Sequence, residues 1–461
     1  MKKILLILPA LLLLFSCEEA YTPPTPGGKT EKETLDPAVD AKIGQALPAW
    51  QEGYLDIHFI NTTTGESTFL IFPDGTQMLV DAAGSISATG AVGSTTNTGI
   101  RKRWDPTVDP SFRAGKFIAD YIKDCMAWTG NSKLDYVIDT HFHADHFGGY
   151  NTSMPVSDLS TTYRKQSLPE VLDLLPVGLL MDRGWPSYDY PFDMQTKASN
   201  ASAIKNYVTA VKWHVANRGL KAEMFRAGAA DQIVMLRNPG AYSDFSVRNI
   251  AVNGNIWDGS QSGFTATFPA LKDIKVANPA SVGNADCCPE ENHCTTVFKL
   301  SYGTFDFFHG GDAQYDGCST FAWKDMETAV AKASGKVDVM KADHHGVTNT
   351  NGHGFVAKNG HVCEAMKYLD PRCWIINSWT DGHPRQPVFE GVTGYAQGMD
   401  VFITNSNSDM YSYARWSRVK GSDGHIVVRV EKGGKRYFIY TLTDSDGKKA
   451  VKNISGPYTS R

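Results

Sequence analysis

The sequence predicts an α/β fold, and three observations support this prediction. Short segments with the pattern of β-strands, residues 54–60, 67–72 and 78–84, follow one another near the start of the chain. Residues 117–128 then have the apolar spacing of a helix, and residues 134–138 form a short apolar segment typical of a buried strand. A group of histidines follows directly after this last segment.

The first three segments predict a β-meander. Polar and apolar side chains alternate in residues 54–60, which places one face of that strand against a core. Residues 73–76, Pro-Asp-Gly-Thr, favour a tight turn, so residues 67–72 and 78–84 are expected to be neighbouring strands. The third strand carries an acidic residue, Asp81, close to its end.

The helix and the fourth strand follow from apolar spacing. Residues 117–128 place four apolar side chains on one helical face: Ile118, Tyr121, Ile122 and Cys125. Residues 134–138 are too short for a buried helix and match a strand in length. The order strand, strand, strand, helix, strand therefore indicates an α/β arrangement.

Composition excludes some classes of protein. The chain has 461 residues, of which 42% are hydrophobic and 20% charged, and its formal net charge is -4. These values are typical of a globular protein with a sizeable core. The charge gives no specific signal for a nucleic-acid partner.

The N-terminus has the layout of a secretory signal. Two lysines precede an apolar run at residues 4–15, which is short for a membrane span. The run leads into Leu-Phe-Ser-Cys17, which resembles a bacterial lipobox, although a plain signal peptide or an uncleaved anchor is the alternative. We expect a lipoprotein signal peptide at 1–17, lipid on Cys17 and a flexible, proline-rich tether at 18–49, which together place the protein on a membrane of the bacterial cell envelope.

The cysteines leave two interpretations open. The chain has eight cysteines, of which Cys287, Cys288 and Cys294 lie close together in sequence. Outside the cytosol they could close a local disulfide loop, but the pairing cannot be deduced from sequence. A structural metal site that adds His293 is the alternative, which adjacent cysteines disfavour because they chelate poorly as a pair.

The histidine group indicates a metal site. Its four potential ligands lie within six residues at the end of the strand 134–138: His141, His143, Asp145 and His146. Imidazole and carboxylate suit zinc and similar divalent metals. In an extended segment His141 and His143 project to the same side and can share one cation, which leaves Asp145 and His146 for a second.

The pattern His141-x-His143-x-Asp145-His146 resembles the motif of the metallo-β-lactamase-fold hydrolase superfamily. This resemblance implies an αβ/βα four-layer sandwich with a dinuclear metal site between two sheets. It also implies further ligands downstream, and His-Gly-Gly-Asp312 is similar to the element whose aspartate bridges both metals.

A second downstream element, Asp-His344-His345-Gly, is similar to the one that supplies the last histidine. His344 is the expected ligand because it comes first after the strand, and His345 is the alternative. The remaining ligand of the first metal is open between Asn292 and His293. Asn292 matches a branch that includes the hydrolase domain of the competence DNA-uptake protein, whereas His293 lies where other branches have a liganding histidine.

Two further features resemble that branch. Residues 63–67 stand where it often has Gly-x-Gly-Asp-Ala, and His383-Pro384 is similar to its Gly-His-Pro element. The resemblance covers about residues 54–155 and 290–390. We therefore expect one domain at 50–455, with a mixed α/β insertion at about 152–285 that is a candidate lid.

Three other expectations concern elements outside the motifs. Within the insertion, residues 200–217 have helical spacing and residues 227–236 are expected to form a strand. Near the C-terminus, residues 426–442 are expected to form a β-hairpin that turns at Gly433-Gly434.

The expected function is metal-dependent ester hydrolysis. Two divalent ions, zinc first and manganese or iron as alternatives, would lower the pKa of a bridging water from about 15.7 towards 7 and supply hydroxide. Asp145 would orient this water, and His344 or His383 would aid the leaving group. The resemblance favours a phosphoester, in a small molecule or a polymer. The alternatives are a lactamase or lactonase and a non-catalytic surface binding lipoprotein.

Overall fold

The structure is a computed structural model. It describes residues 36, 38–62, 65–83, 113–274, 288–315, 321–347, 362–378, 383–444 and 449–461. The chain divides into two units, Met1–Asp36 and Pro37–Arg461, and every described helix and strand belongs to the second. The predicted signal peptide with Cys17 and residues 18–35 of the predicted tether lie outside the described residues.

The first sheet has nine strands in the order β18-β17-β16-β1-β2-β3-β4-β5-β6. Its strands are β1 (Leu55–Phe59), β2 (Thr68–Ile71), β3 (Gln77–Val80), β4 (Leu134–Ile138), β5 (Val177–Asp182), β6 (Lys221–Met224), β16 (His425–Val430), β17 (Arg436–Leu442) and β18 (Val451–Thr459). The strands β1 to β3 form an antiparallel meander, as predicted, while β3 to β6 are parallel. β16 and β17 pair antiparallel across the turn at Gly433 and Gly434.

The second sheet also has nine strands, in the order β15-β14-β13-β12-β11-β10-β7-β8-β9. Its strands are β7 (Phe245–Val252), β8 (Asn255–Trp257), β9 (Phe264–Ala266), β10 (Val297–Tyr302), β11 (Phe305–His309), β12 (Val339–Lys341), β13 (Cys373–Ile376), β14 (Asp400–Ile403) and β15 (Val419–Ser422). The strands β11 to β15 are parallel, so their carboxyl ends meet at one edge of the sheet.

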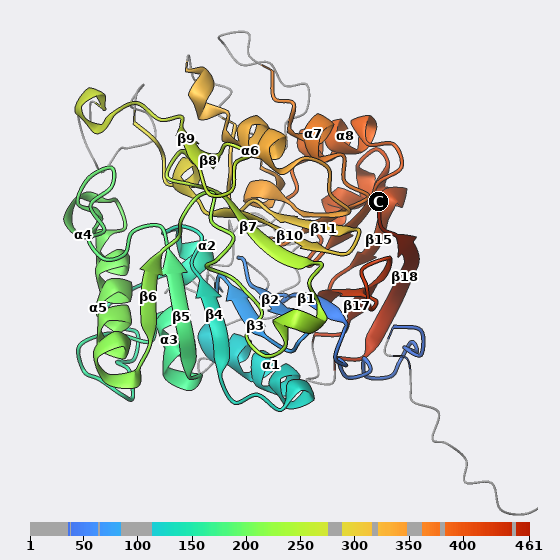
Figure 1. Ribbon diagram of the computed structural model, residues 1–461, viewed down its shortest axis with the longest axis horizontal. Coiled ribbons are helices and arrows are strands. Elements are labelled where there is room, and N and C mark those ends of the chain that lie inside the picture. The colour runs from blue at the N-terminus through green and yellow to red at the C-terminus, as the bar shows by residue number, and fades with distance from the viewer. Residues whose placement is uncertain are drawn as a thin grey trace, which may run out of the picture. The chain divides into compact units, whose positions relative to one another are not determined.

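Helices cover the outer face of each sheet, and this confirms the predicted αβ/βα sandwich (Figure 1). On the first sheet lie α1 (Ala114–Thr129), α3 (Ser167–Leu174) and α5 (Ala201–Arg218); on the second lie α6 (Met326–Ser334), α7 (Ala365–Leu369) and α8 (Gln386–Tyr395). Short helices complete the described elements: α2 (Ala144–Phe147), α4 (Met194–Lys197), and the 3₁₀ turns η1 (Pro239–Ala241), η2 (Leu271–Asp273), η4 (Asn292–Cys294), η5 (Ala322–Lys324), η6 (Asp343–Gly346), η7 (Ser408–Ser412) and η8 (Trp416–Arg418).

The core between the two sheets follows from the alternation of side chains along the strands. Ile57 and Phe59 of β1 point into it, and the Phe59 and Phe307 rings meet across the sheets with centroids 6.0 Å apart. On β17, Ile439 faces this central core while Tyr440 faces the helices. The sheets are therefore joined by a continuous apolar layer that excludes water from the edge where the site lies.

The insertion extends both sheets. Its strands β5 and β6 add to the first sheet beyond β4, and β7 to β9 add to the second sheet beyond β10. The predicted strand at 227–236 is wrong. This segment crosses from one sheet to the other, and its backbone bonds to β7 where Gly228 and Ala229 exchange hydrogen bonds with Asn249, at 2.9 Å each.

The predicted tether ends too late. Within residues 38–49, Ala38, Ala41 and Leu47 are buried in the core beneath the helices of the first sheet. Gly44 donates a backbone hydrogen bond to Val451 O at 2.8 Å, and Val451 N donates to Gln45 O at 2.8 Å. This part of the chain is therefore held by β18, which a flexible tether would not be.

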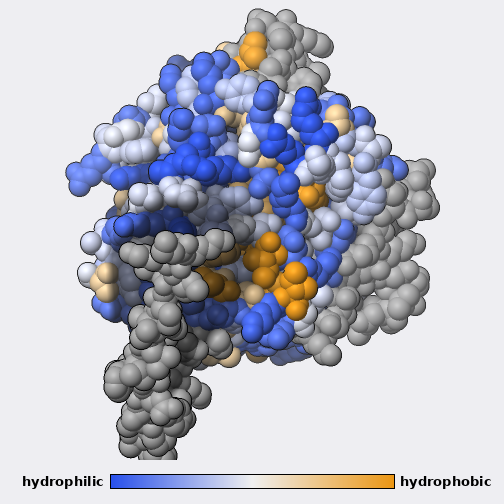
Figure 2. Space-filling model, turned by 90° about the vertical axis from the view of Figure 1, so that its right-hand side faces the viewer, coloured by the Kyte–Doolittle hydropathy of each residue, from blue (hydrophilic) through white to orange (hydrophobic). Residues whose placement is uncertain are grey.

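Surface and cysteine features complete the description. Figure 2 shows one face of the molecule on which hydrophilic side chains predominate and hydrophobic ones form small separate areas. No helix among the described residues is long and apolar enough to span a bilayer. The described cysteines are buried, and they include Cys288 and Cys294, whereas Cys287 lies outside the described residues.

Candidate metal centre

The candidate ligands follow strands of both sheets. β4 of the first sheet is followed by the histidine motif, and β11 and β12 of the second sheet are followed by the two downstream elements. The structure brings all of these loops to one edge of the sandwich, where the ligand residues cluster: His141, His143, Asp145, His146, Asp312, His344 and His345. This edge is where parallel strands end, and their rigid backbones position the loops.

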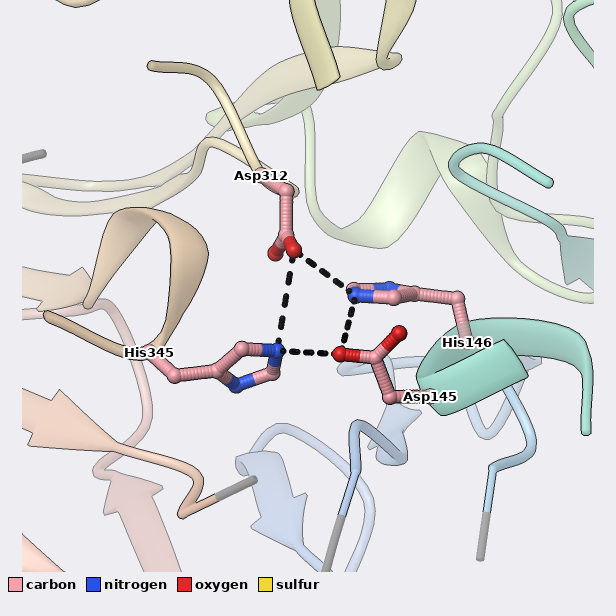
Figure 3. Close-up of side chains that lie close together, drawn as sticks. All are labelled: Asp145, His146, Asp312 and His345. Carbon is pink, nitrogen blue, oxygen red and sulfur yellow. Dashed lines mark hydrogen bonds and ion pairs between the residues drawn. The ribbon is translucent and has the colours of Figure 1, made fainter. Parts of the chain in front are cut away.

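Four of these residues form a tight buried group (Figure 3). One potential ligand atom from each of Asp145, His146, Asp312 and His345 lies within 4.8 Å of all the others. His146 Nε2 is 3.1 Å from Asp312 Oδ2, and His345 Nε2 is 3.2 Å from Asp145 Oδ2. The group contains His345, the alternative of the sequence analysis, in the place expected for His344.

Further histidines lie near Asp312 outside this tight group. His141 Nε2 is 3.1 Å from His143 Nδ1 and 3.8 Å from Asp312 Oδ2. His344 Nε2 is also 3.8 Å from Asp312 Oδ2. His344 thus approaches Asp312 from outside the tight group, as His141 does.

Asn292 and His293, the two candidates for the remaining ligand of the first metal, have different surroundings. The Asn292 amide contacts the His344 ring, with Nδ2 3.2 Å from Nε2. His293 Nδ1 accepts a hydrogen bond from the backbone N–H of Glu290 at 3.1 Å, and its ring packs against Trp323. The contacts of His293 described above are to Glu290 and Trp323, while His344 lies next to Asn292.

His383 lies beside the turn that carries His344 and His345. The backbone N–H of Arg385 donates to Gly346 O at 2.9 Å, which holds residues 383–385 against that turn. The side chain of His383 is buried. Burial lowers its pKa to about 3, aided by the nearby His345, so His383 is neutral near neutral pH.

Asp81 orients the histidine motif, a role that the sequence analysis did not assign. Its Oδ2 is 2.7 Å from His146 Nδ1 and accepts from Thr140 Oγ1 at 2.7 Å, while its Oδ1 accepts from Thr140 N at 2.7 Å. Carboxylates commonly hold the second nitrogen of a metal-binding histidine in this way. The sequence feature that could have indicated this role is the position of Asp81 directly after β3.

A buried ion pair lies on the opposite side of Asp312. Lys341 Nζ donates to Gly311 O at 2.6 Å and lies 3.1 Å from Glu66 Oε2 and 3.5 Å from Asp312 Oδ1. Glu66 also accepts from Asn377 Nδ2 at 2.9 Å. Lys341 therefore fixes the carboxylate of Asp312 through its other oxygen, a contact that no sequence motif had indicated.

The electrostatics of the centre favour a positive charge. Burial alone would lower the pKa of His146, but Asp312 and Asp81 raise it well above its usual value. Burial alone would raise the pKa of Asp312, but the neighbouring imidazoles, His146 first, hold it well below its usual range. Burial lowers the pKa of His141 strongly and that of His344 to about 4, which leaves both rings neutral. The ionised Asp312 carboxylate beside the neutral rings of His141 and His344 provides donors of the kind that a divalent cation requires.

The orientation of the histidine rings provides a separate test of whether these residues fit a metal ion. His345 Nδ1 lies 2.8 Å from Asn377 O, a carbonyl that can only accept, so Nδ1 carries the proton and Nε2 is left with a lone pair. This Nε2 faces the Asp145 and Asp312 carboxylates at 3.2 and 3.6 Å. His146 Nε2 and both Asp312 oxygens are buried without a hydrogen-bond partner among the described residues. The Asp312 oxygens and His345 Nε2 therefore offer donor atoms to one buried point, and this donor set fits a metal ion.

Comparisons with known proteins yielded distant structural similarity only. No family model matches the chain. No curated protein sequence matches it either. The similar solved structures include a variant of the CmlA beta-hydroxylase, which is 11% identical with a TM-score of 0.34, the match covering 77% of this chain and 53% of that one. The chain thus spans about half the length of that protein.

Two further structures are similar over most of their own length. A protein from Parabacteroides distasonis that is provisionally named a metal-dependent hydrolase is 10% identical with a TM-score of 0.28, the match covering 76% of this chain and 92% of that one. Zinc-bound PqqB from Methylobacterium extorquens is 12% identical with a TM-score of 0.32, with 76% and 97% covered.

Proposed function

We propose that the protein is a metal-dependent hydrolase of the metallo-β-lactamase-fold superfamily, with two divalent cations, zinc first, at the centre around Asp312. The observation that carries this proposal is the shared carboxylate. Asp312 Oδ2 lies 3.1 to 3.8 Å from a nitrogen of His141, His146, His344 and His345, which approach it from both sheets. One set would comprise Asp145, His146 and His345, and the other His141, His143 and His344.

Different residues would have different roles in this hydrolysis. When bound, two divalent cations supply an acidified water and neutralise charge that grows on the electrophile in the transition state. Asp145 would orient the attacking water, because its Oδ2 lies 3.2 Å from His345 Nε2 inside the tight group that would hold a cation. His383, neutral and beside His345, would contact the substrate or exchange a proton with the leaving group.

A phosphoester is the substrate class that we favour. Asn292 beside His344, and His383-Pro384 packed on the following turn, are the features that resemble the DNA-uptake branch of the superfamily, which favours phosphoesters. Asp312 would help to hold both cations, and two cations would neutralise the charge that grows on a phosphoryl group.

Turnover and metal content together test the proposal. His143→Ala and Asp312→Ala should lower turnover of bis-para-nitrophenyl phosphate below about a hundredth of the wild-type rate and lower bound metal below two equivalents. Asp231→Ala, which changes an exposed carboxylate remote from these residues in sequence, is the control and should retain both. If the fully metal-loaded protein cleaves lactams or lactones instead, the alternative hydrolase is correct. If it cleaves no ester, lactam or lactone, it is a binding protein.

We also propose that Cys17 carries lipid and anchors the protein in the cell envelope. The motif that supports this proposal is Leu-Phe-Ser-Cys17 after the apolar run. Mass spectrometry of the mature N-terminus should show a lipid-modified Cys17, and Cys17→Ala should release the protein from the membrane fraction. An unmodified N-terminus at another residue would contradict the proposal.

A further inference from the structure

A pocket lies where the edges of the two sheets meet, and we call it the edge pocket. β15 ends the second sheet and β18 ends the first, and these two strands contact each other (Figure 1). The edge pocket has a volume of about 330 Å³ and is lined by parts of β15, β17 and β18 and of the turns η7 and η8. None of the described residues that line it is a candidate metal ligand. It is therefore a separate site, and its volume is within the range of small-molecule sites.

Two aromatic side chains form one wall of the edge pocket. The Tyr411 side chain is 56% exposed, and its ring centroid lies 5.2 Å from that of Trp416, with 63° between the ring planes. Trp416 packs in turn against the buried Phe389, with ring centroids 6.0 Å apart. These contacts hold the rings in place. They therefore offer apolar surface that a ligand can cover at little cost in side-chain entropy.

The other walls of the edge pocket are polar, and their hydrogen-bonding groups are held in place. Lys452 Nζ donates to Ser422 O at 3.2 Å and to Asp423 O at 2.7 Å, so one of its three N–H groups is left for a ligand. The Asp423 carboxylate accepts from the backbone N–H of Ser406 at 2.8 Å and from Ser422 Oγ at 2.9 Å. A donor and an acceptor are thus fixed before a ligand binds.

The charges around the edge pocket have both signs. Lys420 Nζ lies 3.9 Å from Asp400 Oδ1, and Lys452 and Asp423 have opposite formal charges. Such a mixture gives no field of one sign that would attract a polyanion or a polycation. Hydroxyl groups suit this pocket better, because each of them can both donate and accept a hydrogen bond.

We propose that the edge pocket binds an uncharged saccharide. One face of a sugar ring carries C–H groups that can cover an aromatic ring, and the hydroxyl groups at its rim donate and accept hydrogen bonds. Tyr411 and Trp416 match the first feature, and Lys452 and Asp423 match the second. This binding goes beyond the proposed function, because it does not depend on hydrolysis at the metal centre.

Saturation-transfer NMR of the full chain with uncharged trisaccharides tests this binding. The probes are maltotriose, cellotriose, mannotriose, xylotriose and triacetylchitotriose. At least one of them should bind with a dissociation constant of about 1 mM or lower. Tyr411→Ala should weaken that binding at least about tenfold, equivalent to about 1.4 kcal/mol, because it removes an exposed ring from the aromatic wall. Tyr411→Phe keeps the ring and should bind about as tightly as the wild type.

An aromatic residue at the other end of the second sheet provides the matched surface control. Phe264 is 51% exposed on β9, at the opposite edge of the sheet from β15, so Phe264→Ala should leave saccharide binding unchanged. Failure of all these trisaccharides to bind, or unchanged binding in Tyr411→Ala, would overturn the proposal. Tighter binding of a thymidine trinucleotide that also requires Tyr411 would overturn it too, because the pocket would then be a nucleic-acid site. Saccharide binding without hydrolysis at the metal centre would instead refute the proposed function and support the edge pocket.

Discussion

His344 and His345 are neighbours in the chain, yet they face different halves of the centre. Both have left-handed backbone conformations, with φ of 42° and 56°, which cost energy in residues other than glycine. This sharp turn after β12 directs His345 towards Asp145 and His344 towards Asn292. The strained turn therefore directs two adjacent histidines towards different partners.

Single alanine variants should separate the two roles. His345→Ala removes a donor from the group with Asp145 and His146, and His344→Ala removes one from the group with His141 and His143. Each variant should bind about one equivalent of zinc tightly, with the other weakened about tenfold to a hundredfold, as titration with a competing chelator would show. Retention of two tight equivalents by His344→Ala would exclude His344 as a ligand.

For individual residues, the sequence predicted which residues form the site better than it predicted their contacts. The chemistry of imidazole and carboxylate was enough to select the histidine motif and Asp312, and the structure gathers them at one place. The choice between His344 and His345 depends on two backbone angles that periodicity does not encode. Lys341 beside Asp312 escaped notice because a buried lysine is recognisable only once its partners are known.

At the scale of elements, one buried ion pair joins the first strand to a strand from the far end of the chain. Asp56 of β1 is paired in register with Arg429 of β16, and its two carboxylate oxygens accept from Arg429 Nε and Nη2 at 2.8 and 2.6 Å. Both side chains are fully buried. The meander is thereby closed onto the C-terminal hairpin.

Asp56→Ala should be strongly destabilising, since it leaves the Arg429 guanidinium buried and unpaired. We expect the free energy of unfolding to fall by about 3 to 5 kcal/mol in urea denaturation. Asp231→Ala breaks an exposed pair with Arg226, 51% and 74% exposed, and should cost less than about 1 kcal/mol. Similar losses of unfolding free energy in the two variants would show that the buried pair contributes no more stability than the exposed pair.

The ion pair between Asp56 and Arg429 also makes the stability of the fold depend on pH. Burial alone would raise the pKa of Asp56, but Arg429 and then His58 lower it to about 2, from 3.8 in the unfolded chain. A depressed carboxyl pKa contributes stability above the unfolded value, and this contribution is lost as the pH falls from about 4 to 2. The difference in stability between the wild type and Asp56→Ala should therefore shrink across that interval.

Elements with strong periodicity were predictable, whereas crossings between sheets were not. The predicted helix at 117–128 corresponds to α1, and the predicted strand at 134–138 to β4. Residues 227–236 have the composition of a strand but run between the sheets, and the Gln232 side chain accepts from Arg226 N at 2.8 Å. This side-chain hydrogen bond takes the place of a backbone hydrogen bond between strands. Apolar spacing in the sequence cannot distinguish a strand from a segment that crosses between the sheets.

At the scale of the whole second unit, the two sheets contribute complementary parts of one centre. His141 to His146 follow β4 of the first sheet, and Asp312 and His345 follow strands of the second. The pairing of sheets was expected from the resemblance alone, because contacts between residues so far apart in sequence leave no local pattern. A cation bound at Asp312 would link the sheets, in addition to the apolar core between them.

Metal removal should therefore lower the stability of the second unit as a whole. A ligand that binds only the folded state stabilises it by about 4 kcal/mol when its free concentration is about 1,000 times its dissociation constant. Adding a chelator should lower Tm by several degrees in calorimetry, and excess zinc should restore it. Asp312→Ala is the matched control, because without the shared carboxylate its Tm should respond little to either treatment. If the wild type shows no shift, or Asp312→Ala shows the same shift as the wild type, then the groups on the two sheets do not hold a common metal centre.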